Sequence, residues 1–247
     1  MPLTQATTVE SSPAQPEVNA IAPAWHTACI LLFLLAMVTL TKHWVAGGQI
    51  GQAHSRLPGY ILTMIMEWLI VAFIALGPRW RGASLRVLAG KIPLGWRSIG
   101  RDLWLAAAYL LAANIVLAIL GHILARFGPA SDNAALKNLL PHSILENAAF
   151  LLLALTAGIC EEMIFRGYLQ HQLTAWTRNA AAGIALQGIL FGVAHAYQGS
   201  MMMIVISVYG CMYGAFAYWR KSLRPGMIAH FLQDAVGGLV LARFALK

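Results

Sequence analysis

The most restrictive feature of this sequence is a series of apolar segments, each close to the length that crosses a lipid bilayer as a helix. A helix needs about 20 apolar residues to span roughly 30 Å of hydrocarbon. Such segments recur near residues 26–46, 59–78, 102–125, 143–169, 180–197, 201–219 and 225–245. Lipid offers the backbone no hydrogen-bond partners, so each segment must satisfy its own polar groups as a helix. The sequence therefore predicts an all-α, polytopic transmembrane helix bundle of about seven membrane segments, within a range of six to eight.

Composition agrees with this interpretation. Of the 247 residues, 59% are hydrophobic and only 11% are charged, whereas a soluble domain carries about 25% charged residues. The shortfall argues against a soluble protein with a large core. We expect an integral, multi-pass protein whose main partners are membrane lipids.

The N-terminal region has a different character. Residues 1–24 contain Pro, Ser, Thr, Gln and Ala, two glutamates and no Lys or Arg. Such a segment is predicted to be a disordered tail, and a secretory signal peptide would need a basic region that is missing. Residues 25–142 would then form the N-terminal membrane helices and residues 143–247 a second membrane region.

A basic loop over residues 79–101 separates the second and third apolar segments. Its arginines and lysine alternate with Trp, Leu, Val and Ile, a pattern typical of a short interfacial stretch on an anionic leaflet. A solvated basic loop fits the same pattern. Seven crossings place this loop on the same side as Arg178, Arg220, Lys221 and Arg224. By the positive-inside rule that side, with the N-terminus, is cytoplasmic.

The net charge of +8 mostly reflects such loop arginines, so it does not indicate nucleic-acid binding. The three cysteines, Cys29, Cys160 and Cys211, lie in apolar runs with no metal-type spacing. We interpret them as small buried hydrophobes, with a Cys160 thiol nucleophile as the minor alternative.

Glycines in two later segments have GxxxG spacing, at Gly188–Gly192 and Gly210–Gly214. Small residues at this spacing let helices approach closely in lipid. We expect these glycines to pack helices within one bundle, with a dimer interface as the alternative; the oligomeric state stays open.

Three polar residues of the 143–169 segment form an ordered group. Glu161 and Glu162 are adjacent, so on a helix they point about 100° apart and can serve different purposes. Arg166 follows Glu162 at i+4, in the register of a helical ion pair. A buried arginine needs a carboxylate. Glu162 is therefore expected to neutralise Arg166, which leaves Glu161 to face another helix.

The following segments add two histidines. His195 lies one helical turn after Phe191, and His230 precedes Asp234 at i+4, where a carboxylate can orient an imidazole and fix its tautomer. Ionisable groups within a membrane are costly and usually functional. Other polar residues of the apolar segments lack partners in register and are interpreted as structural: Glu67, Glu146 and His122.

The depths of these residues are harder to reconcile. Counted from the flanking basic residues at 1.5 Å per residue, Glu161 and His195 both lie about 25 Å deep, whereas His230 lies only about 9 Å deep. We expect either that residues 170–178 lie along the interface or that the 180–197 helix is tilted or broken.

Taken together, the three groups resemble a known family. EEMIFR (161–166), FGVAH (191–195) and HFLQD (230–234) are similar to the motifs EExxxR, FxxxH and HxxxN/D of the CPBP intramembrane proteases. These are the CAAX-protease and bacteriocin-processing proteins, also called the Abi family. The motifs have the same order, each in its own apolar segment. The resemblance covers about residues 143–245 and implies a catalytic membrane core in a bacterial inner (plasma) membrane.

The resemblance implies an intramembrane endopeptidase that hydrolyses a peptide bond of a membrane-anchored protein or peptide. In that family the first Glu and the His of the second motif are taken to activate a water. By this correspondence Glu161 is the general base and His195 helps to hold the water. Glu162 and Arg166 would brace the helix.

The third motif would serve the oxyanion. His230 and Asp234 would stabilise it or orient its donor. The family often has Asn where this chain has Asp234. An ionised Asp cannot donate a hydrogen bond, so we assign Asp234 to orienting His230 or to a metal.

A metal is left open by the sequence. If one binds, Glu161, His195 and His230 would hold it, and these donors suit Zn²⁺ in kind. The spacing is not HExxH, so no helix face carries two ligands around a base. We favour a glutamate mechanism without metal over a zinc-dependent one.

Two other functions compete with the protease. A non-catalytic membrane scaffold or bacteriocin-immunity protein could share the fold. An ion-coupled transporter could use the same acids and histidines as a proton relay, although it would favour an inverted repeat. Nothing in the sequence selects a substrate or says whether it is prenylated.

Overall fold

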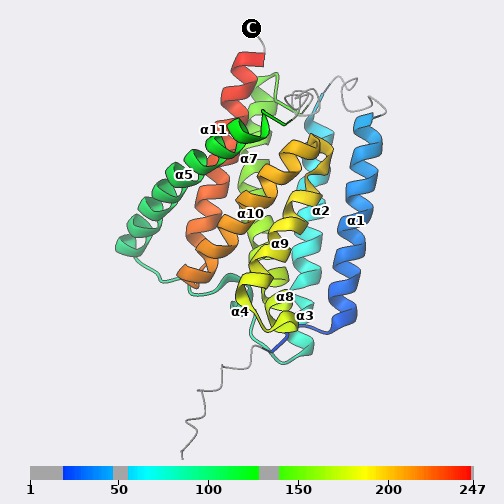
Figure 1. Ribbon diagram of the computed structural model, residues 1–247, viewed down its shortest axis with the longest axis vertical. Helices are drawn as coiled ribbons and strands as arrows, with labels where there is room; N and C mark the ends of the chain where they lie inside the picture. Colours follow the sequence, from blue (N-terminus) through cyan, green and yellow to red (C-terminus); the bar gives the residue numbers. More distant parts are fainter. Residues whose placement is uncertain (1–18, 47–54, 128–138, 246–247) are drawn as a thin grey trace, which may run out of the picture.

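The computed structural model describes residues 19–46, 55–127 and 139–245 of the chain. Across these ranges the chain forms a bundle of helices without a β-strand (Figure 1). The predicted all-α class is confirmed.

Each of the seven predicted apolar segments is helical. The long helices are α1 (Ala24–Ala46), α2 (Leu57–Ile74), α5 (Trp96–Leu124), α7 (Ile144–Glu161), α9 (Ala180–Ala194), α10 (Ser200–Arg220) and α11 (Arg224–Ala245). Shorter elements join them: α3 (Leu76–Trp80), α4 (Arg86–Ala89), the π-helix η1 (Glu162–Leu169), α8 (Gln170–Thr177) and the 3₁₀-helix η2 (Ala196–Gln198).

The helices make this an integral, multi-pass membrane protein. In the described ranges five helical segments are long and apolar enough to cross a membrane: Ala24–His43, Leu57–Trp80, Trp96–Leu124, Ile144–Thr177 and Ser200–Arg220. α9, with 15 residues, is shorter than the roughly 20 needed to cross alone. α11 has 22 residues but contains His230, Gln233 and Asp234, which lower its apolarity. The bundle thus has the seven predicted helices, with five rather than seven meeting the requirements of a full span.

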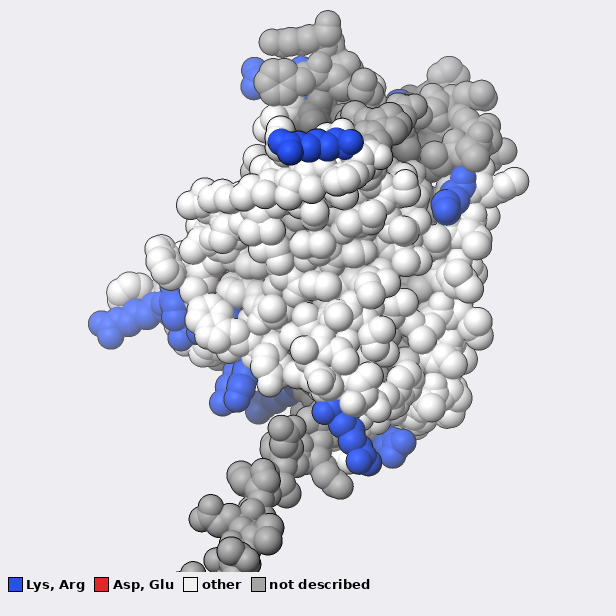
Figure 2. Space-filling view, in the orientation of Figure 1, with Lys and Arg blue, Asp and Glu red and all other residues white. Residues whose placement is uncertain are grey.

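Successive long helices run in alternating directions, with α3, α4 and the end of α8 at one pole and the C-terminus at the other (Figure 1). The face in Figure 2 carries Lys and Arg side chains toward the two poles and a charge-free band between them. This distribution suits a bilayer, because the uncharged band would face hydrocarbon.

The basic loop is attached to the bundle rather than free in solvent. Leu88 in α4 is buried, and the backbone N–H of Lys91 donates to the carbonyl of Lys221 over 2.9 Å. On the outer side, Leu94 and Trp96 are 93% and 78% exposed. An anchored inner side and an apolar outer side favour the interfacial interpretation over a solvated loop.

The expectation that residues 170–178 lie along the interface is wrong. Residues 170–177 form α8, which continues the helix beyond η1 and packs against α9, with Gln172 fully buried. α8 also ends lower than the point where α11 begins (Figure 1). Depths counted along α8 and along α11 therefore start from different planes, which removes the apparent mismatch between Glu161 and His230.

A buried chain of hydrogen bonds holds the start of α1. The His26 Nε2–H donates to the Phe73 carbonyl over 3.0 Å, so Nδ1 accepts from the Tyr168 hydroxyl at 2.6 Å. Gln172 donates to Thr27 Oγ1 over 2.8 Å and to the Ala22 carbonyl over 3.0 Å.

Of the predicted disordered tail, residues 1–18 lie outside the described residues. Its end does not fit the prediction, because Ala22 is buried against α8.

The GxxxG glycines form the contact between α9 and α10, as expected for packing within one bundle. A Cβ at Gly188 would collide with the Cys211 side chain and lie 2.7 Å from the Cys211 nitrogen. A Cβ at Gly210 would lie 3.0 Å from Gly188 Cα. Side chains at these positions would push the helices apart.

We therefore expect Gly188→Ala to destabilise the protein by about 1–3 kcal/mol, because overpacking a close helix contact costs that much. Thermal unfolding in detergent would measure the effect. Gly121→Ala in α5 is the matched control, since nothing lies within 4 Å of a Cβ there. Equal unfolding temperatures for the two variants would contradict the close contact.

Candidate active site

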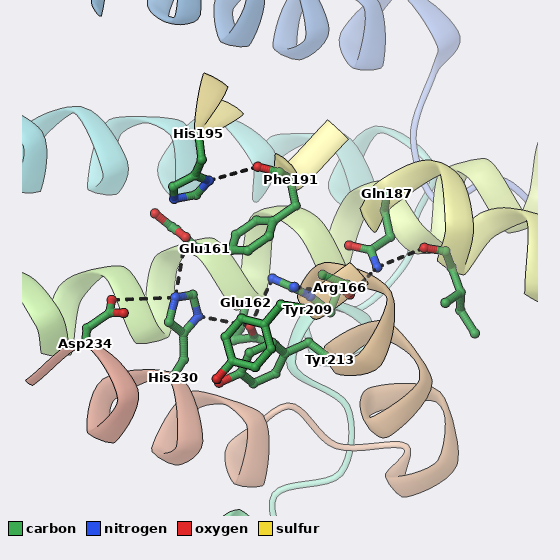
Figure 3. A network of polar contacts seen from close by, with 12 residues as sticks. Glu161, Glu162, Arg166, Gln187, Phe191, His195, Tyr209, Tyr213, His230 and Asp234 are labelled. Carbon is green, nitrogen blue, oxygen red and sulfur yellow. Dashed lines mark hydrogen bonds and ion pairs between the residues drawn. The ribbon is translucent and has the colours of Figure 1, made fainter. Parts of the chain in front are cut away.

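The three sequence motifs meet at one place in the bundle. The junction of α7 and η1 supplies Glu161, Glu162 and Arg166, the C-terminal end of α9 supplies Phe191 and His195, and α11 supplies His230 and Asp234 (Figure 3). Every residue predicted for the site therefore lies in a single cluster.

The predicted ion pair between Glu162 and Arg166 is present. Arg166 Nη1 lies 3.0 Å from Glu162 Oε1, and both side chains are fully buried. The guanidinium also lies 4.3 Å from the Phe191 ring centroid and 5.0 Å from that of Tyr213. Aromatic faces stabilise a cation, so Arg166 is neutralised by Glu162 and enclosed by rings from α9 and α10.

The pair lies in a π-helix. η1 covers Glu162–Leu169, which is long for a π-helix, since these usually occur as single turns and often at functional sites. The wider turn brings Gly167 against α4, where a Cβ would collide with the Leu88 carbonyl. η1 therefore fixes both the buried pair and the contact with the basic loop.

Glu162 has a second partner that the sequence did not indicate. His230 Nδ1 lies 3.1 Å from Glu162 Oε1. A carboxylate can only accept, so Nδ1 carries the hydrogen and donates it. One oxygen of Glu162 thus binds both Arg166 and His230, and Glu162 rather than Asp234 fixes the tautomer of the His230 ring.

Asp234 occupies a different place from the one expected. Its Oδ2 lies 3.6 Å from His230 Nε2, too far for a good hydrogen bond. Glu161 Oε2 lies at the same 3.6 Å from Nε2. The Nε2 edge of His230 therefore faces two carboxylates, and each lies 3.6 Å from Nε2.

Glu161 is the accessible carboxylate of the pair. Its side chain is 19% exposed, whereas that of Glu162 is fully buried. Figure 3 shows the Glu161 carboxylate between the rings of His195 and His230. Its Oε2 is buried on the His230 side and has no hydrogen-bond partner among the described residues, so this carboxylate keeps an unused acceptor inside the cluster.

His195 is held by the backbone of its own helix. Nδ1 donates to the Phe191 carbonyl over 2.8 Å, which leaves Nε2 with a lone pair in the neutral ring. The Phe191 side chain is buried and packs against His195 with ring centroids 4.8 Å apart. Phe191 thus supports His195 on one side and Arg166 on the other.

Cys160 does not fit a nucleophile. Its side chain is fully buried, so a substrate could not reach its sulfur. The structure agrees with its interpretation as a small apolar residue.

The sequence missed three groups around this cluster. Tyr213 stacks on His230 with centroids 5.4 Å apart. Tyr197 in η2 has three carboxyl groups as electrostatic neighbours, those of Glu161, Asp234 and Glu67. Desolvation raises the pKa of Tyr197 to about 12, which keeps its hydroxyl protonated. Glu67 in α2, interpreted above as structural, has Glu161 as its strongest charged neighbour. A carboxylate within an apolar segment was the available signal for Glu67.

The polar cluster contains side chains of the kinds that bind metal ions. The imidazoles and carboxylates are of the type that Zn²⁺ prefers. In the described ranges, however, no three His, Cys, Asp or Glu side chains are arranged to hold a metal ion. His230 donates Nδ1–H to Glu162 and turns Nε2 toward two carboxylates, an orientation that histidine metal ligands also adopt. The donor types therefore suit a metal ion, but the described residues do not gather three of them around one point.

Comparison with known proteins identifies this part of the chain. Residues 144–236 match the family of type II CAAX prenyl endopeptidase Rce1-like proteins, and all three motifs lie within the match. Residues 144–236 are therefore similar to the core of the CPBP family, as the motifs implied. The uncharacterized protein YpbD of Bacillus subtilis is 29% identical over 102 residues, which cover 40% of this chain and 46% of YpbD. The chain thus spans about half the length of that curated relative. No solved structure matches the present chain.

Within the CPBP-like core the two adjacent glutamates should differ sharply in their effect on stability. We expect Glu162→Gln to lower the free energy of unfolding by about 3–5 kcal/mol, because it leaves the buried Arg166 without a carboxylate. Glu161→Gln should change stability little, since its partly exposed side chain makes no close ion pair. Thermal unfolding in detergent compares the two variants. Similar unfolding temperatures would contradict the division of roles.

Proposed function

We propose that this chain is an intramembrane endopeptidase in which Glu161 activates a water to hydrolyse a peptide bond. The supporting observation is the contrast between adjacent glutamates. Glu162 is fully buried and engaged by Arg166 and His230, whereas Glu161 is partly exposed between two imidazoles. A base must reach a water molecule and keep a free oxygen, and Glu161 meets both requirements.

In the proposed reaction a water binds between Glu161 and His195. Glu161 accepts one of its protons while the oxygen attacks the peptide carbonyl. His195 Nε2 accepts a hydrogen bond from the same water, because its Nδ1–H is already donated to the Phe191 carbonyl. The fixed ring orientation lowers the entropic cost of placing the water.

The tetrahedral oxyanion then needs a donor. His230 Nε2, carrying a proton in the imidazolium form, donates to it, and Glu162 and Asp234 balance the charge of the ring. Charge balance by fixed groups is an effective form of oxyanion stabilisation. Glu161 returns its proton to the amine that leaves, which completes hydrolysis.

The proposed substrate is a protein or peptide held at the membrane. The site lies among helices that cross the bilayer, and the Rce1-like match concerns prenyl endopeptidases. A membrane anchor would hold the scissile bond near the site and raise its effective concentration.

Glu161→Ala and His195→Ala are each expected to abolish cleavage without unfolding the protein. The measurement compares the membrane proteome of cells that express the wild type or Glu161→Ala, and seeks a protein that is shortened only with the wild type. His122→Ala in α5 is a matched control, since its ring contacts Arg126 outside the site. Wild-type processing by both site variants would rule out the proposed reaction.

The proposed reaction uses the glutamate without a metal. Elemental analysis of purified active protein is therefore expected to show less than stoichiometric zinc, and a chelator should leave cleavage of the substrate intact. Stoichiometric zinc that is lost together with activity would replace this mechanism with a metal-dependent one.

A further inference from the structure

Glu67 is a buried carboxyl group outside the three motifs. It lies in α2 and is 8% exposed, and its Oε2 has no hydrogen-bond partner among the described residues. An unpaired carboxylate is costly in a membrane interior. The mechanism above does not account for this residue.

The alignment of α2 with α7 places Glu67 beside the site. The two helices run in the same direction (Figure 1), and two contacts fix their register. The Arg56 N–H donates to Glu146 over 2.8 Å, and the Tyr60 and Phe150 rings lie 5.7 Å apart. The same offset places Glu67 level with Ala157, one helical turn, or about 6 Å, before Glu161.

The electrostatic neighbours of Glu67 agree with this register. Its strongest charged neighbour is Glu161, followed by His230 and Asp234 on α11. Two other titratable groups face it, the thiol of Cys160 on α7 and the hydroxyl of Tyr197 in η2. Glu67 therefore lies within electrostatic reach of the proposed base, on the α2 side of α7.

Three carboxylates near a single imidazolium would leave an excess of negative charge, so at least one of these carboxyl groups is expected to be neutral. Glu162 is matched by Arg166, which leaves Glu67, Glu161 and Asp234 around the single ring of His230. Like charges in a low-dielectric site favour binding a proton on the most buried group. Glu161 and Asp234 have side-chain exposures of 19% and 37%, so the proton belongs on Glu67.

We propose that Glu67 is a positioning residue for the base, a neutral carboxyl group from α2 whose O–H donates to Glu161. The inference rests on the proposed function of Glu161 and adds a fourth helix to the site. A neutral carboxylic acid can act as a buried hydrogen-bond donor. Here it would fix the rotamer of Glu161 and leave the second carboxylate oxygen to the water.

The test compares substitutions that keep or remove the donor. Glu67→Gln keeps an N–H donor of the same shape, and Glu67→Ala removes it. With the membrane protein found in the Glu161→Ala comparison as substrate, Glu67→Ala is expected to lower kcat by roughly 100-fold with little change in KM, since a displaced catalytic group costs about that much. Glu67→Gln should stay within a few-fold of wild type. Thr63→Ala, at an exposed position of α2 where the hydroxyl binds the Gly59 carbonyl, is the control.

The pH profile separates positioning from a structural role. Activity of the wild type should fall at alkaline pH as the His230 imidazolium and Glu67 each lose a proton. Glu67→Gln cannot ionise at this position, so its alkaline limb should keep the His230 ionisation and lack the second one. Wild-type kcat in Glu67→Ala would overturn the proposal. So would a Glu67→Gln enzyme as inactive as Glu67→Ala, or one whose alkaline limb has the same number of ionisations as that of the wild type.

Infrared spectroscopy tests the proton without any substrate. The purified protein should show the carbonyl band of a protonated carboxylic acid that disappears in Glu67→Gln, persists in Glu146→Gln and shifts in Glu161→Gln. A missing band would overturn the inference about Glu67 even if Glu161 is the base. An intact band with no peptidase activity in the wild type would instead reject the proposed function alone.

Discussion

The site depends on the double use of one buried carboxylate oxygen. Glu162 Oε1 binds the Arg166 guanidinium at 3.0 Å and the His230 ring at 3.1 Å. A buried charge without a partner destabilises a protein by several kcal/mol, so α11 must stay where His230 can reach Glu162. The same contact fixes the ring that faces Glu161. Stability and site geometry therefore have one origin.

The surrounding packing keeps that arrangement rigid. Gly158 lets α11 approach α7 closely, since a Cβ there would lie 2.9 Å from the Phe231 nitrogen. Gly210 lets α9 approach α10, and its carbonyl accepts from both Arg166 and Gln187. Small residues thus bring the helices together, and buried donors satisfy the backbone between them.

The sequence predicted what depends on spacing along one helix. Apolar length predicted the seven helices, and the i,i+4 register predicted the Glu162–Arg166 pair. The sequence could not predict the hydrogen bond between His230 and Glu162 or the position of Glu67, because both depend on how separate helices align. Hydrophobic patterning also does not separate a π-turn from an α-turn, so η1 was not foreseen. The depth counts that had suggested an interfacial segment at residues 170–178 also failed, because α8 packs against α9 and buries Gln170, Gln172 and Leu173.

The uneven lower pole of the bundle has a consequence for access to the site. Because α11 begins above the end of α8 (Figure 1), His230 stands only about 9 Å along the axis from the basic start of its helix. Water and an extended peptide that enter beside the start of α11 would therefore need to penetrate less than two helical turns to reach His230. A substrate tethered at the surface would then need to thread only its last few residues between the helices.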